Sequence, residues 1–163
     1  MNTQGLNLFI IDDNQLLLTG LRNYLHTRFG THLNISTFST GKSALNKVDK
    51  NTKIVILDYF LDGENGNDVL QSIKTINPQT EVIMLSSNED IGVAIDAFRK
   101  GAADFVIKGE KDKKKISSLI YNILTYPIRI MVREFGISKF LAIFLMTFLT
   151  MGIAVFFILQ FLY

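Results

Sequence analysis

The chain has 163 residues, of which 48% are hydrophobic, and a formal net charge of +2. This length allows one domain of ordinary size plus an appendage, and the hydrophobic content supports a full core, which excludes a largely disordered chain. The lack of cysteine excludes disulfides and thiolate chemistry, and the balance of acidic and basic residues over residues 1–126 gives no indication of nucleic-acid binding.

Short apolar runs and segments with helical periodicity alternate along the first 126 residues. The apolar runs predict strands over 6–11, 33–38, 53–57, 81–85 and 104–107. The periodic segments predict helices over 15–28, 41–49, 67–76, 90–100 and 112–125. This alternation is typical of an α/β fold, because crossover helices connect parallel strands and cover both faces of the sheet.

Residues with reactive side chains follow four of the predicted strands. These residues are Asp12 and Asp13 after the first strand, Asp58 after the third, Ser86 after the fourth and Lys108 after the fifth. Because open α/β sheets bind ligands at the carboxyl ends of their strands, we expect these side chains to lie together. Asp12 or Asp13 taken singly is more often a helix N-cap than a catalytic residue. The complete set predicts a phosphoryl-transfer site.

The three carboxylates carry the chemistry of this predicted site. Carboxylates at close range repel one another and do not all remain ionised without a cation. A hard divalent ion with oxygen ligands, Mg²⁺, is therefore expected at Asp12, Asp13 and Asp58. One carboxylate can then attack phosphorus and form an acyl phosphate, while Lys108 and Ser86 hold the transferring oxygens.

From about Leu6 to Tyr126 the chain resembles the receiver domain of bacterial two-component response regulators. The resemblance rests on the residues at the strand ends, on Phe105 and on residues 58–66. It implies a doubly wound, flavodoxin-like sheet of five parallel strands in the order 2-1-3-4-5. It also implies that Mg²⁺ is held by Asp13, Asp58 and the backbone carbonyl of Phe60, with Asp12 acting mainly through a water. The implied roles are Asp12 and Asp13 as acidic pair, Asp58 as phosphoacceptor, Ser86 as switch hydroxyl, Phe105 as switch aromatic and Lys108 as the family's lysine.

Four positions near the predicted site distinguish this chain within the family that it resembles. Gly109 stands where proline is common, and Ser87 stands where a small apolar residue is usual. Neither residue removes a reacting group, so phosphorylation remains expected. Phe60 and Asn88 occupy the two variable positions that flank the hydrolytic water, and the bulk of Phe60 predicts slow loss of the phosphoryl group.

Residues 140–163 contain no charged side chain and consist mainly of Phe, Leu, Ile and Met. At about 1.5 Å per residue, a helix of this length spans about 36 Å, enough to cross a hydrocarbon core of about 30 Å. A buried amphipathic helix would need a polar face, which the segment lacks. Because Arg129, Arg133 and Lys139 precede the span, the positive-inside rule predicts a single-pass protein of the inner (cytoplasmic) membrane, with residues 1–139 in the cytoplasm.

Residues 127–139 connect the two predicted parts, and Pro127 is expected to end the preceding helix. Apolar residues recur here at helical spacing while Arg129, Arg133 and Glu134 take the other side. An interfacial helix on the lipid bilayer and a linker helix packed on protein fit this pattern equally well. The predicted organisation is a receiver domain (1–126), an amphipathic juxtamembrane linker (127–139) and a transmembrane helix (140–163).

Two functional classes fit these features. The first is a membrane-anchored single-domain response regulator of a phosphorelay, which accepts a phosphoryl group on Asp58 from a histidine kinase or phosphotransfer protein. Because the sequence shows no DNA-binding or enzymatic output module, such a protein is expected to signal by contact with a membrane protein partner. The second is a structural or regulatory subunit of a larger membrane complex that uses the receiver fold for docking regardless of phosphorylation. Neither class is an enzyme beyond self-phosphorylation from a phosphodonor and slow autodephosphorylation.

Overall fold

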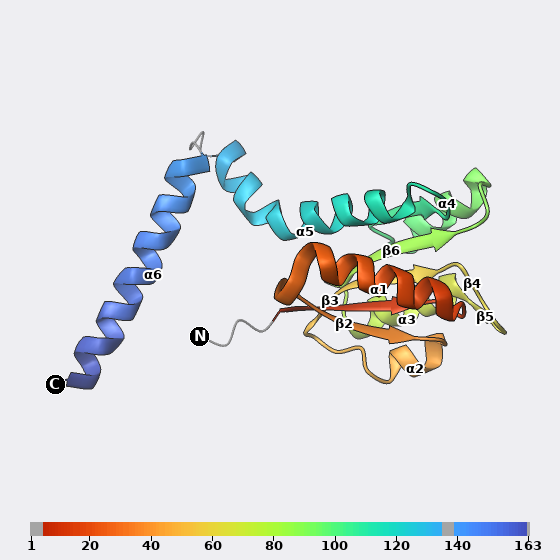
Figure 1. Cartoon of the computed structure of the whole chain (residues 1–163), viewed down its shortest axis with the longest axis horizontal. Helices are drawn as coiled ribbons and strands as arrows, with labels where there is room; N and C mark the ends of the chain where they lie inside the picture. Colours follow the sequence, from red (N-terminus) through yellow and green to blue (C-terminus); the bar gives the residue numbers. More distant parts are fainter. Residues whose placement is uncertain (1–4, 135–138, 163) are drawn as a thin grey trace. The chain divides into compact units, whose positions relative to one another are not determined.

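The structure, a computed structural model, describes residues 5–134 and 139–162 (Figure 1). Five strands form the main sheet: β1 (Leu6–Ile11), β2 (Leu33–Phe38), β3 (Thr52–Asp58), β6 (Glu81–Ser86) and β7 (Asp104–Ile107). The helices are α1 (Gln15–Phe29), α2 (Gly41–Leu45), α3 (Gly66–Ile76), α4 (Ile91–Arg99), α5 (Asp112–Glu134) and α6 (Lys139–Leu162), with a short 3₁₀ helix, η1 (Gly30–His32), after α1. Two further strands, β4 (Phe60–Leu61) and β5 (Glu64–Asn65), form a separate antiparallel ribbon.

The main sheet is parallel throughout and has the strand order β2-β1-β3-β6-β7. Because β4 and β5 lie outside this sheet, the order corresponds to the predicted 2-1-3-4-5, and the flavodoxin-like fold is confirmed. The chain first adds β2 on one side of β1 and then crosses to add β3 on the other side. This change of direction lies at the carboxyl ends of β1 and β3, where open α/β sheets bind their ligands.

Helices cover both faces of the main sheet. Phe9 and Val55 belong to a buried cluster that the sheet shares with α2, α3 and α4. The next residue of each strand points to the opposite face, and Ile10 and Ile56 are fully buried there. Buried side chains of α1 and α5 complete that second layer: Leu18, Leu21, Leu25, Ile116 and Ile120. The double cover explains why β3 and β6 have nearly continuous apolar sequences.

Two predicted helix boundaries are wrong. The helix expected over 41–49 ends at Leu45, where the Lys47 N–H donates to the Ala44 carbonyl at 2.8 Å and tightens the chain into a turn. Asp49 then forms a further turn, in which its carboxylate accepts hydrogen bonds from Asn51 and Thr52. Pro127 does not end a helix, since α5 continues from Asp112 to Glu134. A proline removes one hydrogen bond from a helix interior, and a helix continues past it when it bends locally.

Among the described helices, α6 is long and apolar enough to cross a membrane, by length and composition. The described side chains of Ile143–Gln160 are exposed. The chain divides into two compact units, residues 1–120 and 121–163, and α5 contributes to both. Within the predicted linker 127–139, residues 135–138 lie outside the described residues. The contacts of that linker with lipid or protein stay a prediction.

Candidate functional site

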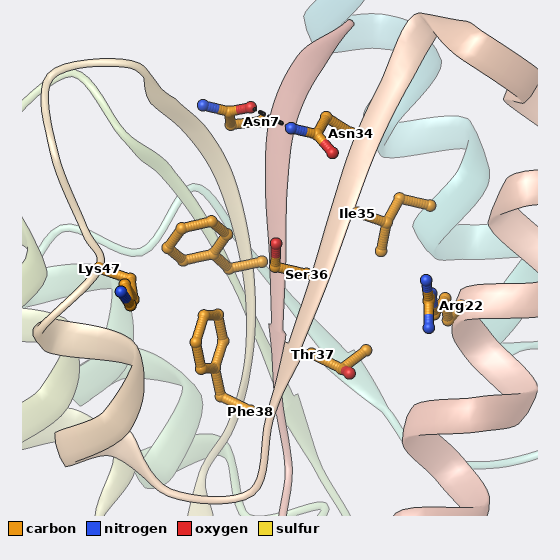
Figure 2. Close-up of a pocket in the computed structure, with 9 residues that line it drawn as sticks. Asn7, Arg22, Asn34, Ile35, Ser36, Thr37, Phe38 and Lys47 are labelled. Atoms are coloured by element: carbon orange, nitrogen blue, oxygen red, sulfur yellow. Dashed lines mark hydrogen bonds between the residues drawn. The ribbon is translucent and has the colours of Figure 1, made fainter.

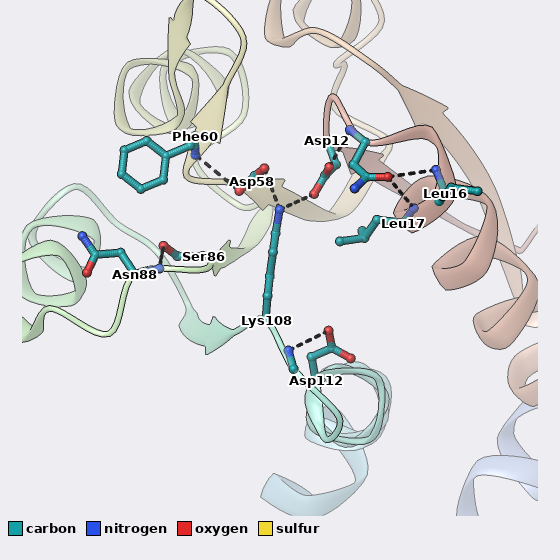
Figure 3. Close-up of polar contacts among 11 residues, drawn as sticks. Asp12, Leu16, Leu17, Asp58, Phe60, Ser86, Asn88, Lys108 and Asp112 are labelled. Atoms are coloured by element: carbon teal, nitrogen blue, oxygen red, sulfur yellow. Dashed lines mark hydrogen bonds and ion pairs between the residues drawn. The ribbon is translucent and has the colours of Figure 1, made fainter.

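The carboxyl edge of the main sheet brings together the residues that were predicted from the strand ends (Figure 3). Asp12 and Asp13 follow β1, while Asp58 and Ser86 are the last residues of β3 and β6. Lys108 follows β7, the strand at one edge of the sheet. Four strands that are distant in sequence therefore each contribute a polar side chain to one edge.

Lys108 connects two carboxylates from different strands. Its Nζ donates to Asp12 Oδ2 at 2.8 Å and to Asp58 Oδ2 at 2.7 Å. Asp12 is fully buried, Asp58 is nearly so, and the Lys108 side chain is only 22% exposed. Two acids and one base in this geometry form charge-assisted hydrogen bonds and leave a net negative charge at the edge.

Asp13 adds a third carboxylate to this pair. One carboxylate oxygen from each of Asp12, Asp13 and Asp58 lies within 4.8 Å of the other two. Asp13 is exposed, whereas the other two are buried, so the group opens to solvent on the Asp13 side. Oxygen ligands in this number and spacing fit a hard divalent cation.

The alternative in which Asp12 or Asp13 caps a helix is wrong. The N-cap of α1 is Asn14, whose side-chain oxygen accepts hydrogen bonds from the backbone N–H groups of Leu16 and Leu17. Asp12 instead accepts the backbone N–H of Asn14 through Oδ1 at 2.8 Å. Asn14 therefore supplies the cap and also fixes the orientation of the Asp12 carboxylate. The role of Asn14 was not predicted, although asparagine just before a helix is a common cap signal.

The electrostatics of the site follow from burial and from the shared lysine. Burial raises the pKa of Asp58 above its ordinary value, and the negative charge of Asp12 adds to this effect against the opposing hydrogen bond from Lys108. Burial acts to lower the pKa of Lys108, but its hydrogen bonds to Asp12 and Asp58 prevail and raise that pKa. Lys108 therefore stays charged at neutral pH, and a cation at the carboxylates favours the ionised form of Asp58.

Hydrogen bonds from backbone N–H groups hold the loop after β3 close to Asp58. The Phe60 N–H donates to Asp58 Oδ1 at 3.3 Å, and the Gly66 N–H donates to the Tyr59 carbonyl at 2.9 Å. Gly63 has a φ of 72° at the tip of the β4–β5 ribbon, a conformation that favours glycine. The ribbon leaves the Phe60 ring 53% exposed beside the carboxylates.

We expect Gly66→Ala to destabilise the fold by about 1–3 kcal/mol, the usual cost of overpacking. A Cβ at position 66 would overlap the Asp58 carbonyl oxygen and lie 2.8 Å from Tyr59 Cα, so backbone must move. Gly20→Ala is the matched control, because a Cβ there meets only the end of the Lys113 side chain at 3.6 Å. The free energy of unfolding from denaturant titration is expected to fall only for Gly66→Ala; equal values for both variants would contradict this packing.

Ser86 lies near the carboxylates but makes no hydrogen bond to them within the described part of the chain (Figure 3). Ser86 is fully buried, and its Oγ accepts the Asn88 N–H at 2.9 Å. The Lys108 N–H donates to the Ser86 carbonyl at 2.7 Å, which fixes the base of the lysine to β6. Phe105 is buried in the cluster shared with α4 and therefore points inward.

The geometry defines the chemistry that the site can support. A buried carboxylate, Asp58, lies between a lysine that can balance negative charge and an acidic group that can hold a divalent cation. Such a site can transfer a phosphoryl group to a carboxylate oxygen. The fold places it at the topological switch point of a parallel five-stranded sheet.

Comparison with known proteins agrees with this arrangement. A family model, the response regulator receiver domain, matches residues 8–120. The chemotaxis protein CheY of Listeria monocytogenes is 31% identical over 104 residues, which cover 63% of this chain and 86% of that protein. A solved complex of CheX, CheY, BeF3 and Mg²⁺ from Borrelia burgdorferi is similar with a TM-score of 0.64 and 25% identity, covering 72% of this chain and 88% of the matched chain. The chain therefore belongs to the response regulator receiver domain family.

The chain is also similar to the response regulator protein TodT of Pseudomonas putida. It is 26% identical over 120 residues, which cover 73% of this chain but 52% of TodT. The chain thus spans about half the length of this relative. The similarity concerns the receiver part, and the residues that follow it in this chain lie outside the family match.

Proposed function

We propose that this protein is a membrane-anchored response regulator in which Asp58 accepts a phosphoryl group from a histidine kinase or phosphotransfer protein. The observation that carries the proposal is the shared contact of Lys108 with Asp12 and Asp58 beside the exposed Asp13. A domain that serves only for docking has no need to bury two carboxylates at one edge. Membership of the receiver family supports a role in phosphorelay signalling.

In the proposed transfer, a carboxylate oxygen of Asp58 forms a bond to phosphorus while the bond between phosphorus and the donor breaks. The donor leaves with the electron pair of that bond. Oδ1 of Asp58 is held by the Phe60 N–H and Oδ2 by Lys108, so the carboxylate is fixed before the reaction. The ammonium group of Lys108 can move from the carboxylate to the phosphoryl oxygens and balance their charge.

Asp13, Asp58 and the Phe60 carbonyl would hold Mg²⁺, with Asp12 acting mainly through a water. The three grouped carboxylates fit this role. When bound, Mg²⁺ supplies positive charge that offsets the repulsion between the carboxylates and the incoming phosphoryl group. The related CheY complex from Borrelia burgdorferi contains Mg²⁺ together with BeF3, which supports the same ion here.

Labelling of the full chain with radioactive acetyl phosphate tests the proposed function. We expect incorporation that requires Mg²⁺, is lost with a chelator and maps by mass spectrometry to the peptide that contains Asp58. The acyl phosphate should be labile to hydroxylamine, unlike a phosphoserine. Label on any other residue, or incorporation that does not depend on Mg²⁺, would contradict the proposal.

Phosphorylation is proposed to change the face made by α4, β7 and the start of α5. In the family's usual coupling, the switch hydroxyl moves to the phosphoryl group, which here would draw Ser86 toward Asp58. Phe105 is buried in the structure, which agrees with the inward position of the switch aromatic in that coupling. On α4, Ile91, Ile95 and Phe98 are exposed and offer apolar area for a partner.

We expect Phe60→Ala to speed the loss of the phosphoryl group by about 3- to 10-fold, a barrier change of no more than about 1.4 kcal/mol. The Phe60 ring is 53% exposed next to Asp58, so its removal opens the path of the attacking water. Phe98→Ala removes a ring of similar exposure, 49%, on α4 and should leave the rate unchanged. Dephosphorylation of the labelled protein measures the effect; equal rates for wild type and Phe60→Ala would refute a shielding role.

The membrane anchor is proposed to be α6, with the receiver domain in the cytoplasm and a membrane protein as partner. We expect the full chain to stay in the membrane pellet after alkaline carbonate extraction. Leu149→Arg combined with Ile153→Arg should release it, because each arginine near the centre of a span costs about 2.5–3.5 kcal/mol. Leu149→Ala with Ile153→Ala is the matched control and should remain in the pellet. Extraction of the wild type would contradict the anchor.

The exposed apolar side chains of α4 also favour the second functional class, a docking subunit of a membrane complex. Ile91 is 74% exposed and lies with exposed Ile95 and Phe98 on one helix, and such apolar area can mark a protein-binding surface. In that class, a partner that copurifies in mild detergent would be retained equally with unphosphorylated and phosphorylated protein. Retention that changes with acetyl phosphate treatment supports the phosphorylation switch instead.

A further inference from the structure

The two edges of the main sheet differ in how they are protected. At the β7 edge, Lys115 of α5 donates from Nζ to the Phe105 carbonyl at 2.6 Å and pairs with Asp104 at 3.2 Å. At the other edge, no described residue places a side-chain hydrogen bond on the backbone of β2, and no described strand pairs with its outer side. An edge of this kind presents free N–H and C=O groups that can pair with another strand.

Two hollows of about 540 and 590 Å³ lie along the outer edge of β2. Both are lined by Asn7, Arg22, Asn34 and Ile35, so they adjoin, and together we call them the β2 groove. The Asn34 side chain donates to Asn7 at 3.0 Å where the two hollows adjoin. Together the linings of the two hollows include every residue of β2, Leu33–Phe38.

The two sides of the β2 groove have similar chemistry (Figure 2). Ile35 and Thr37 point to the side where Arg22 lies, whereas Phe38 points to the side where Lys47 lies. The Phe38 ring packs on Phe9 with centroids 4.9 Å apart and forms an apolar floor. Each side of the strand therefore combines an apolar surface with a cation.

Charge in the β2 groove is of one sign. Its lining includes the exposed cationic side chains of Arg22 and Lys47 and no acidic residue. This reflects the sequence, because no aspartate or glutamate occurs between Asp13 and Asp49. The domain is balanced in charge as a whole, but its α1, β2 and α2 side is basic.

We propose that the β2 groove binds an acidic segment of a partner protein, which adds as an extended strand beside β2. The backbone of the segment would pair with the free edge groups of β2, and alternate side chains would point to the two sides of the groove. Acidic side chains on either side would meet Arg22 or Lys47. This site is separate from the carboxylate cluster and does not require phosphorylation of Asp58.

The groove favours this occupant over two others. A second copy of the chain, paired edge to edge, would bring Arg22 and Lys47 close to the same cations of its partner, which is unfavourable. Anionic lipid headgroups would satisfy the cations, but they would leave the edge groups of β2 unpaired. An extended acidic segment uses both the charge and the free backbone.

The test uses the full chain in detergent micelles and a fluorescent peptide of alternating Glu and Val. We expect Arg22→Glu with Lys47→Glu to weaken binding at least tenfold, while the matched control Lys111→Glu with Lys114→Glu leaves it unchanged. Replacing the valines of the peptide by proline keeps its charge but removes backbone donors, and should also weaken binding at least tenfold. Hydrogen exchange of the β2 amides should slow when the Val peptide binds.

Three outcomes would overturn the proposal. Equal binding of the proline peptide, or unchanged exchange of the β2 amides, would show attraction by charge without strand addition. Vesicles of phosphatidylglycerol that displace the peptide and bind with unchanged amide exchange would identify a lipid surface. Dimers in analytical ultracentrifugation that are lost in Arg22→Glu with Lys47→Glu would identify self-association. All these variants change exposed residues, and thermal melts will show that they fold.

Discussion

Asp58→Asn is expected to reduce labelling by acetyl phosphate below detection. The substitution replaces a carboxylate nucleophile by an amide, which has no ionised oxygen to attack phosphorus. No other carboxylate in the group is placed in the same way, because Asp12 is fixed by the Asn14 N–H and Lys108 while Asp13 is exposed. Label should therefore not shift to a neighbour.

The matched control for this variant is Asp62→Asn, an exposed aspartate in the same loop, which should be labelled like the wild type. Loss of fold is not expected in Asp58→Asn. The pKa of Asp58 is raised by folding, so its contribution to stability is present at low pH and is lost as the pH rises through that raised value. The asparagine variant cannot ionise, and its free energy of unfolding at neutral pH should equal or exceed that of the wild type.

Lys108→Ala is expected to slow labelling by about 100- to 1000-fold, the loss that follows removal of one donor to a developing oxyanion. The alanine also leaves two buried carboxylates without their shared cation. Asp58 would then hold its proton more tightly, which lowers the fraction of nucleophile. Initial rates of labelling at saturating Mg²⁺ measure the combined effect.

Two further lysine variants separate charge from geometry. Lys111→Ala removes an exposed lysine nearby and should leave the rate unchanged. Lys108→Arg keeps the positive charge but replaces a compact ammonium group by a planar fork. Lys108→Arg should keep the free energy of unfolding of the wild type but lose most of the labelling rate. Labelling of Lys108→Ala at the wild-type rate would show that the lysine has only a structural role.

The fold could be predicted because four strands of the main sheet are apolar runs that end in, or are followed by, a polar residue. Strands 6–11, 33–38 and 104–107 were predicted with the boundaries that the structure has. The ribbon of β4 and β5 could not be predicted, because two-residue strands leave no periodic pattern. The prediction that Pro127 ends a helix was wrong for a different reason. It rested on the local cost of proline alone, whereas the residues on both sides of Pro127 are helical and α5 continues through it.

The residues that form the candidate site could be predicted, but the burial and the hydrogen-bond partners of each residue could not. Asp12 and Asp13 are adjacent in sequence, yet one is fully buried and the other is exposed. The position of Lys108 between Asp12 and Asp58 depends on how far its side chain reaches across the edge of the sheet. A sequence specifies strand ends, whereas burial and partners emerge only after the strands are assembled.

The contacts of Lys108 have a consequence for the order of folding. The residues in its two ion pairs are separated by 96 and 50 positions along the chain. Such contacts form late, since closing long loops is slow. During synthesis Asp12 and Asp58 emerge before Lys108, so the two carboxylates lack their shared cation until β7 joins the edge of the sheet. The proposed acceptance of a phosphoryl group at Asp58 therefore requires that β7, the last strand, has joined the sheet.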